Sequence, residues 1–304
     1  MFRISQLAKT DPVKAGEAIL KFVREQFPDL GATAVIINSS KVSLNSVNGA
    51  IETPAKKYFF KFHAEENEEK NLKGSEYYNV EVLAKAGFPI ITPLYQTTKP
   101  GLQFVIYPFL EYPTAFEKFE EQDARGRDDA LMNAEREYLT TVSGILRKTL
   151  KTCDTAEIGN ASLNQLFYNR LVSTDGAPPR LDLYYNGTLG ALADMKWVIN
   201  GVEYKQSLNE IIAAAKDLLN PRKEKQVAGV IGHGDDHNGN KWFIDGTFVL
   251  FDPAFAGIQP ALLSFVKATF HNTLAHPFWL YEPKQLQGKL KISSEIKNTT
   301  ITSN

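Results

Sequence analysis

A short polar segment in the last third of the chain holds the residue types that could do chemistry. Residues 233–240 read HGDDHNGN, in which Asp235 precedes Asn240 by five residues, and Asp252 follows Asn240 by twelve. Carboxylate and amide oxygens are the ligands that hard divalent cations prefer in proteins. The segment therefore offers one carboxylate that could act as a base, and an oxygen pair, Asn240 and Asp252, that could bind a metal ion such as magnesium.

The elements around this segment are predicted to position it. VAGVI at 227–231 has the apolar character of a short strand, and KWFI (241–244) and TFVLF (247–251) are two strands joined by Asp245-Gly246. Asp-Gly between apolar stretches is a strong hairpin signal. The polar loop directly precedes the first strand of this hairpin, and Asp252 directly follows the second. The two ends of the hairpin should therefore bring the loop and the carboxylate together.

The spacing is typical of a phosphotransfer catalytic loop. In such loops one Asp accepts the proton of the acceptor hydroxyl, an Asn five residues later helps to hold magnesium, and a later Asp holds magnesium against the nucleotide phosphates. The pattern predicts Asp235 as the catalytic base, and Asn240 and Asp252 as the magnesium ligands.

With Asp252 downstream, HGDDHNGN resembles the H-G-D-x-H-x-x-N motif of the aminoglycoside phosphotransferase / choline kinase family. All five fixed positions match, namely His233, Gly234, Asp235, His237 and Asn240. The resemblance implies an α+β, bilobal, protein-kinase-like fold, with an antiparallel-sheet N-lobe that carries one helix and a mainly helical C-lobe. It also implies ATP and magnesium, and it adds His233 to the catalytic group, as the residue that braces the loop backbone.

The same resemblance requires a lysine on the third strand and a glutamate on the following helix. YFFKFH at 58–63 offers Lys61, and strand alternation places Lys61 on the face opposite to Phe60 and Phe62. Its ammonium could then reach the α- and β-phosphates. Glu76 lies fifteen residues further on, in the predicted helix, and is the expected partner of Lys61; Glu81 is the alternative.

Other nucleotide contacts are expected from two segments. FVIYPFLEY (104–112) occupies the place of the hinge, where Tyr107 and Phe109 would offer backbone groups to adenine. No G-x-G-x-x-G lies between the first strands, so SLNSVNG is the candidate phosphate loop, with Ser43, Ser46 and Gly49 as its binding residues. Small polar residues and exposed backbone N–H groups can bind phosphate without that glycine pattern. Pro253-Ala254 follows Asp252 where kinases have Phe-Gly, which argues against switching of this loop but not against metal binding.

The 304 residues favour about two domains. A helix is predicted over 11–27, strands over 34–38, 41–47 and 56–63 with a turn over 48–55, a helix over 75–86, and strands over 88–96 and 101–110. Helices dominate after 111, including one over 207–220 and one over 262–275. The predicted parts are an N-terminal helical extension (1–30), an N-lobe (31–111), a C-lobe (112–281) and a polar, flexible tail (282–304).

Composition narrows the classes of partner. The net charge is −1, without the basic excess typical of nucleic-acid binders, so no nucleic-acid partner is expected. No apolar stretch is long enough for a membrane span, and the N-terminus has no signal-like apolar run, so a cytoplasmic protein is expected. The single cysteine, Cys153, excludes an internal disulfide and a multi-cysteine zinc site.

The leading hypothesis is an ATP- and magnesium-dependent phosphotransferase that moves the γ-phosphate to an alcohol group of a small hydroxylated molecule. A nucleotide-binding pseudokinase or regulatory protein is one alternative, motivated by the missing glycine loop and by Pro253-Ala254. A metallohydrolase is the other, with His233, Asp235, Asp236 and His237 gathered around a transition metal. Residues 112–225, in which the acceptor site is expected, contain no sequence pattern that identifies the acceptor molecule.

Overall fold

The chain is described here from a computed structural model. The structure describes residues 1–38, 46–63, 76–97, 99, 101–173, 178–179, 181–182, 190, 192–274, 293–297 and 300–303. The chain divides into two compact units, one of Met1–Lys148 with Asn238–Ala256 and the other of Thr149–His237 with Gly257–Asn304. These units differ from the predicted lobes, because residues 112–148 and 238–256 join the first unit. The lobe limits therefore stay a prediction.

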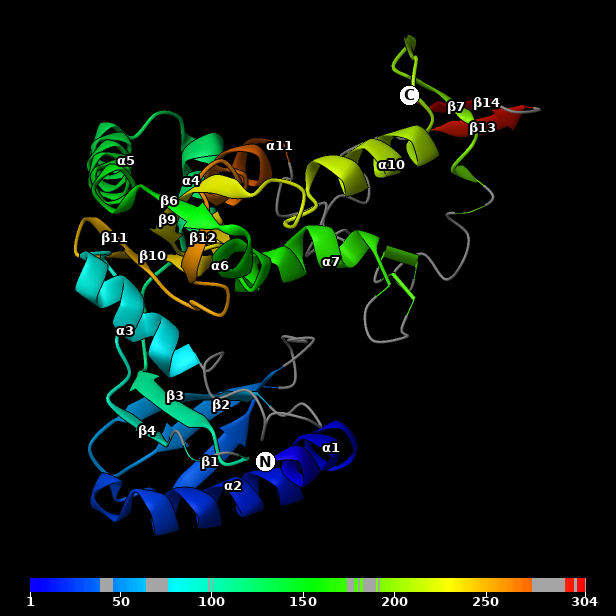
Figure 1. Ribbon diagram of the computed structural model, residues 1–304. Coiled ribbons are helices and arrows are strands. Elements are labelled where there is room, and N and C mark those ends of the chain that lie inside the picture. Colours follow the sequence, from blue (N-terminus) through cyan, green and yellow to red (C-terminus); the bar gives the residue numbers. More distant parts are fainter. Residues whose placement is uncertain are drawn as a thin grey trace. The chain divides into compact units, whose positions relative to one another are not determined.

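The first unit contains a five-stranded antiparallel sheet (Figure 1). Its strands are β1 (Ala34–Ile37), β2 (Ser46–Glu52), β3 (Lys57–His63), β4 (Tyr95–Thr97) and β5 (Phe104–Pro108), in the order β1-β2-β3-β5-β4. The predicted antiparallel arrangement is confirmed, and β3 is its central strand. This sheet, with helices around it, makes the predicted α+β class correct.

The turn predicted over 48–55 is wrong as far as Glu52, because β2 runs over Ser46–Glu52. Of the strand predicted over 41–47, residues 41–45 lie outside the described residues, and Ser46 and Val47 are strand as predicted. The Asn48-Gly49 pair, which favours a turn, lies inside β2, with Gly49 opposite Ile37 and Phe60. A Cβ on Gly49 would stand 2.1 Å from the carbonyl oxygen of Ile36, so the glycine allows close strand packing here.

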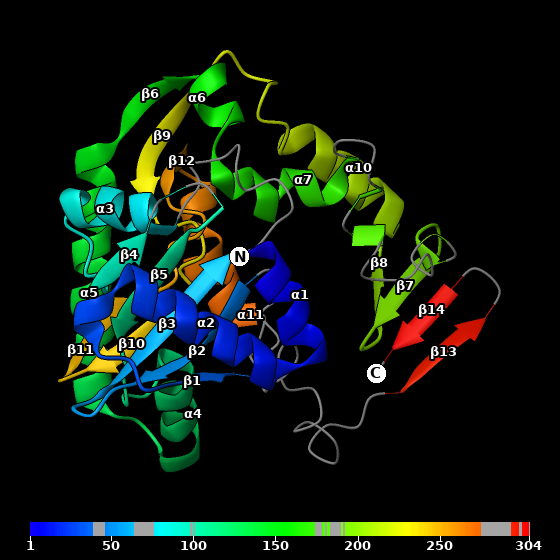
Figure 2. The ribbon, with the colours of Figure 1, turned by 90° about the horizontal axis from the view of Figure 1, so that it is seen from below.

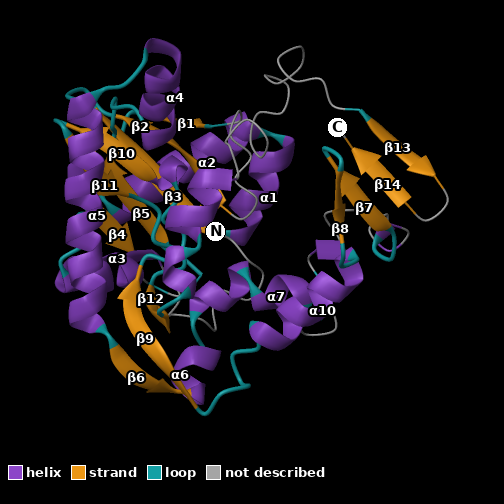
Figure 3. Cartoon of the chain, turned by 90° about the horizontal axis from the view of Figure 1, so that it is seen from above, coloured by secondary structure: helices purple, strands orange, loops and turns teal. Residues whose placement is uncertain are grey.

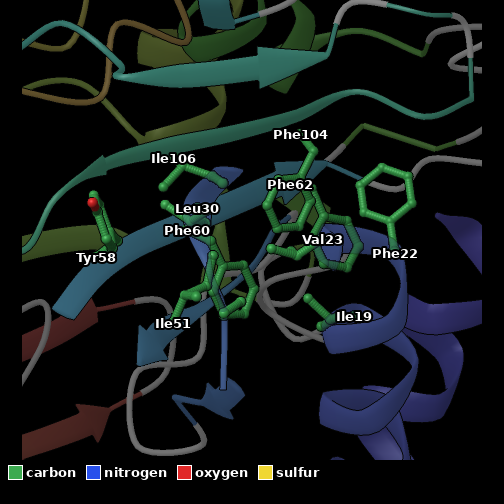
Figure 4. Packing of buried hydrophobic residues seen from close by; sticks show 11 residues of the cluster. Ile19, Phe22, Val23, Leu30, Ile51, Tyr58, Phe60, Phe62, Phe104 and Ile106 are labelled. Carbon is green, nitrogen blue, oxygen red and sulfur yellow. The ribbon is translucent and has the colours of Figure 1, made fainter. Parts of the chain in front are cut away.

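Two N-terminal helices, α1 (Phe2–Thr10) and α2 (Pro12–Gln26), precede the sheet. The helix predicted over 11–27 is confirmed in α2. Its N-cap, Asp11, accepts the N–H of Lys14, and a proline occupies the first helical position. The buried face of α2 packs on the aromatic side chains of the sheet, and Figure 4 shows this cluster from close by. The cluster is formed by Ile19, Phe22, Val23, Leu30, Ala32, Ile51, Tyr58, Phe60, Phe62, Phe104 and Ile106.

Three further helices belong to the first unit: α3 (Glu76–Ala86), α4 (Ala115–Arg125) and α5 (Asp129–Thr149), whose last residue begins the second unit. Gly87 follows α3 with a φ of +99°, and Gly126 separates α4 from α5 with a φ of +95°. Both are left-handed positions at which glycine ends a helix at little cost.

The predicted hairpin is confirmed as β10 (Lys241–Ile244) and β11 (Thr247–Leu250). Its two turn residues, Asp245 and Gly246, both have positive φ, as a two-residue hairpin turn of the primed type requires. Leu250 accepts a hydrogen bond from Ile91 N–H at 2.9 Å, and Phe243 N–H donates to Pro113 O at 2.9 Å. These bonds fix the hairpin within the first unit.

The second unit contains a three-stranded antiparallel sheet, β12-β9-β6. Its strands are β6 (Lys151–Asp154), β9 (Gln226–Gly232) and β12 (Gly257–Pro260), and β9 confirms the strand predicted at 227–231. Other helical elements are η1 (Pro28–Leu30) and η5 (Asn238–Asn240) in the first unit, and α6 (Thr155–Gly159), η4 (Ser162–Leu166), α7 (Tyr168–Leu171) and α10 (Leu208–Leu218) in the second. Ser207 and Glu210 form a capping box at α10, where a helix was predicted.

Within the polar tail predicted over 282–304, the described residues form two strands. These are β13 (Ser294–Lys297) and β14 (Thr300–Ser303), which join β7 (Lys196–Ile199) and β8 (Val202–Tyr204) in the order β13-β14-β7-β8. Figure 2 shows these strands in red and green, and Figure 3 shows the same sheet in orange. Ile301 is buried, and in the register of β14 with β7 it lies opposite Trp197.

Residues 262–275 were predicted as one helix and are helical in pieces. They comprise η6 (Leu263–Phe265), the π-helical turn η7 (Lys267–His271) and α11 (Asn272–Leu274). The N–H of His271 donates to Val266 O at 3.1 Å, five residues back, which is the π-helical pattern. Among the described residues, no helix combines the length and the apolar character needed to cross a membrane.

Candidate active site

Lys61 lies on the central strand of the first sheet and is buried. Phe60 and Phe62 belong to the core cluster under α2, and strand alternation puts Lys61 on the other face. Its ammonium lies 2.5 Å from Oδ1 of Asp252, although the two residues are 191 positions apart. A lysine that is 4% exposed and paired with a carboxylate is not an ordinary solvated surface residue.

Asp252 stands just beyond β11 in an unusual backbone conformation. Its φ is +56°, in the left-handed region that non-glycine residues rarely adopt and that often marks functional sites. The N–H of Phe251 donates to Asn240 O at 2.8 Å, so Asn240 and Asp252 flank the open end of the hairpin, as predicted. Asn240 supplies an amide oxygen, and Asp252 supplies a carboxylate whose side chain is 33% exposed. This donor set fits magnesium, which takes few protein ligands and completes its coordination shell with water and phosphate oxygens.

Helix α3 is tied to the segment that follows Asp252. The side-chain amide of Asn79 donates to Ala254 O at 3.2 Å. Glu76 is the first residue of α3, as predicted, but its side chain lies outside the described part of the structure. The alternative, Glu81, makes an ion pair with Lys85 at 2.6 Å. Asn79 was not anticipated; its place three residues after Glu76, on the same helix face, is the signal that could have identified it.

The residues predicted to contact the nucleotide lie partly where they were expected. Ser43 lies outside the described residues, whereas Ser46 and Gly49 lie in β2, so the prediction that these two belong to a loop is wrong. Tyr107 has a fully buried side chain whose ring centroid lies 4.9 Å from that of Phe251, so it could reach adenine through its backbone alone. Phe109 follows β5 and is 40% exposed.

A buried ion pair next to Asn240 was also not anticipated. Lys241 is 1% exposed, and its ammonium lies 3.1 Å from Oε1 of Glu135 on α5. The same ammonium lies over the rings of Tyr138 and Phe248, at 4.9 and 5.3 Å from their centroids. Cation–π contacts and the carboxylate together compensate for the loss of water around Lys241. This anchors the residue that follows Asn240 to α5.

The remaining motif residues lie in the second unit, in the loop after β9. Gly234 has a φ of +83°, which lets the chain turn sharply between His233 and Asp235. Nδ1 of buried His233 accepts the N–H of Asp235 at 3.3 Å, and the N–H of His237 donates to Asp235 O at 2.9 Å. The side chain of His233 thus braces the loop backbone, as predicted.

The carboxylate of Asp235 faces basic groups. Lys267 Nζ lies 3.2 Å from Oδ1, and His237 Nε2 lies 3.8 Å from Oδ2. Burial raises the pKa of Asp235, but His237, Lys267 and His233 together outweigh burial and hold this pKa below its ordinary value. Asp235 is therefore a carboxylate at neutral pH, as a base must be.

The pKa values of the two histidines near Asp235 are lowered as well. Burial lowers the pKa of His237, and burial together with Lys267 lowers the pKa of His271 to about 4. The two rings lie 5.0 Å apart, centroid to centroid. Both imidazoles are thus neutral at pH 7.

The metallohydrolase alternative is not supported. The described residues contain no group of three or more His, Cys, Asp or Glu side chains that could hold a metal ion. Instead, His233 bonds the loop backbone and the ring of His237 packs beside that of His271.

Comparisons with known proteins find similarity among solved structures. No protein-family model and no curated protein matches the chain. Spectinomycin phosphotransferase APH(9)-Ia, solved with ADP and spectinomycin, is 13% identical with a TM-score of 0.48, over 91% of this chain and 81% of that one. A thermostable mutant of aminoglycoside phosphotransferase APH(4)-Ia is 14% identical with a TM-score of 0.48, over 89% and 82%.

A third structure is aminoglycoside phosphotransferase APH(3'')-Id from Streptomyces rimosus, with ADP and streptomycin. It is 14% identical with a TM-score of 0.44, over 92% of both chains. The solved structures that this chain resembles thus include several aminoglycoside phosphotransferases.

Proposed function

We propose that the chain is an ATP- and magnesium-dependent phosphotransferase that moves the γ-phosphate to a hydroxyl of a small molecule. The observation that carries the proposal is the ion pair between Lys61 and Asp252. It joins the central strand of the sheet to the hairpin that follows HGDDHNGN, which is the connection that a nucleotide site of this kind requires.

Lys61, Asn240 and Asp252 would prepare the donor side. Lys61 would neutralise the non-transferred phosphates, because a buried ammonium is poorly screened by water. Asn240 and Asp252 would hold magnesium, which supplies charge that stabilises the phosphates in the transition state. Asn79, through Ala254, keeps α3 against the segment that carries Asp252. Glu76, at the start of α3, would hold Lys61, and the backbone after β5, from Tyr107 to Phe109, would bind adenine.

Asp235 would prepare the acceptor side. Its pKa is held below the ordinary range, so it is ionised at neutral pH and able to accept or orient the proton of a hydroxyl. His233 fixes the backbone of Asp235 and thereby the direction of its carboxylate. Catalysis would depend mainly on positioning and charge stabilisation.

The test is the transfer of γ-labelled phosphate from ATP to a panel of hydroxylated molecules, with Asp235→Asn as the variant. We expect the variant to keep nucleotide binding and to lose roughly 10²–10⁴-fold in kcat, the usual contribution of a positioned base. Asp217→Asn is the matched control, because Asp217 is exposed and paired with Lys223 in the same unit.

Equal turnover by Asp235→Asn and the wild type would contradict the assigned base. Nucleotide binding without transfer to any acceptor would favour the alternative, a nucleotide-binding protein without transfer activity.

A further inference from the structure

The π-helical turn η7 carries two side chains that meet the loop of Asp235. Lys267, its first residue, reaches Oδ1 of Asp235, and His271, its last, lies beside His237. The side chain of Lys267 is 16% exposed, and that of Asp235 is 17% exposed. An ion pair so sheltered is weakly screened by solvent and salt.

Asp235 faces Lys267 and histidine side chains. His237 and His271 are neutral at pH 7, because the pKa of each is lowered. His233 uses Nδ1 as an acceptor for the N–H of Asp235, and Asp236, next in the loop, is another acid. Among the described residues around Asp235, Lys267 is therefore the group with a fixed positive charge.

We propose that Lys267 is a positioning residue for Asp235, holding its carboxylate in one orientation from a different part of the chain, 32 residues away. The inference rests on the proposed function, in which Asp235 is the base. Lys267 and His271 stand four positions apart on the π-helical turn and meet the same loop, and such turns are frequent at functional sites.

The first experiment compares transfer by Lys267→Met, Lys267→Arg and the control Lys216→Met, whose lysine is exposed on α10. We expect Lys267→Met to lower kcat by roughly 10–100-fold with the KM for ATP within about twofold, and to move the acidic limb of the kcat/KM profile to higher pH. Lys267→Arg should recover most of the loss. Wild-type kcat and an unchanged pH profile in Lys267→Met would overturn the proposal.

The second experiment does not depend on phosphate transfer or on a Lys267 variant. Native-state amide exchange over Lys267–His271 is compared between the wild type, Asp235→Asn and Asp217→Asn. We expect faster exchange in Asp235→Asn alone, because η7 loses its charged partner. Unchanged exchange would overturn the proposal even if Lys267→Met failed to fold. A wild type that transfers no phosphate while Asp235→Asn still loosens η7 would refute the proposed function and leave the coupling standing.

Discussion

At the scale of single residues, the Lys61–Asp252 pair shows how two separate signals in the sequence become one site. Each residue was a candidate on its own, and the direct bond between them was not predicted. Bound magnesium and phosphate would compete for the same two groups. In the nucleotide complex, Lys61 would therefore contact phosphate and Asp252 would contact magnesium.

Replacing Lys61 by Met removes the charge and keeps the apolar stem. We expect a loss of roughly 10²–10³-fold in kcat, the usual cost of one lost electrostatic donor, and weaker ATP binding. Steady-state transfer kinetics measure the first and calorimetry the second. Lys57→Met is the matched control, because Lys57 lies on the same strand but is exposed and pairs with Glu52. Equal losses in both variants would count against a specific role for Lys61.

His271 makes stability depend on pH. Its pKa in the folded chain is about 4, against an ordinary 6.5, so the folded state favours the neutral ring. Between pH 6.5 and 4 the unfolded chain binds more protons, and the free energy of unfolding should fall as the pH falls. For a partly exposed ring we expect on the order of 1–2 kcal/mol after allowance for screening.

Urea unfolding at pH 7 and pH 5 measures this effect. His271→Gln should show a smaller difference between the two pH values than the wild type, with His237 supplying the rest. Asp235 adds nothing in this window, because its pKa is lowered and it is ionised in both states. A difference in His271→Gln as large as in the wild type would contradict the assignment.

The sequence predicts the motif residues better than their partners. Asp235, Asn240 and Asp252 follow from spacing within a few tens of residues, and Lys61 follows from the family resemblance together with strand alternation. Lys267 and Asn79 were missed because their contacts depend on where a later turn and a helix face lie in space. Such contacts have no local pattern.

At the scale of elements, the buried Lys241–Glu135 pair joins the hairpin to α5. Glu135→Gln leaves a buried ammonium without a carboxylate and should lower the free energy of unfolding by about 3 kcal/mol. Lys241→Met keeps the apolar stem, and the carboxylate of Glu135, about one-fifth exposed, can regain water, so its cost should be smaller, about 1 kcal/mol. Urea unfolding of both variants tests the order, and equal costs would contradict this account of the pair.

Elements with strong local signals were predicted correctly. Asp11 and Pro12 specify the start of α2, and Asp245-Gly246 specifies the hairpin. A turn was predicted at Asn48-Gly49 because this pair has turn chemistry, but close packing against Ile36 and Phe60 keeps it in β2. The strands at 294–297 and 300–303 were missed because β14, with which β13 pairs, itself pairs with β7, about a hundred residues earlier.

At the scale of the whole molecule, the motif is divided between two compact units. Asp235 belongs to the second unit, and Lys61, Asn240 and Asp252 belong to the first. The chain passes from one unit to the other between His237 and Asn238, inside HGDDHNGN. The proposed acceptor side and donor side are thus covalently adjacent, although most of their partners come from distant parts of the sequence.

The most direct test of the nucleotide and metal assignment is the thermal shift with ATP, with and without magnesium, in the wild type and in Asp252→Asn. Asparagine tolerates the left-handed backbone of this position, so the variant removes charge with little added strain. A ligand at about 100 times its Kd stabilises by about 2.7 kcal/mol, which gives a clear rise in Tm. Asp245→Asn, at the left-handed turn of the same hairpin, is the control.

We predict a magnesium-dependent rise in Tm for the wild type and for Asp245→Asn, and none in Asp252→Asn. The absence of any rise with ATP and magnesium in the wild type, or an equal magnesium-dependent rise in Asp252→Asn, would contradict the nucleotide and metal assignment.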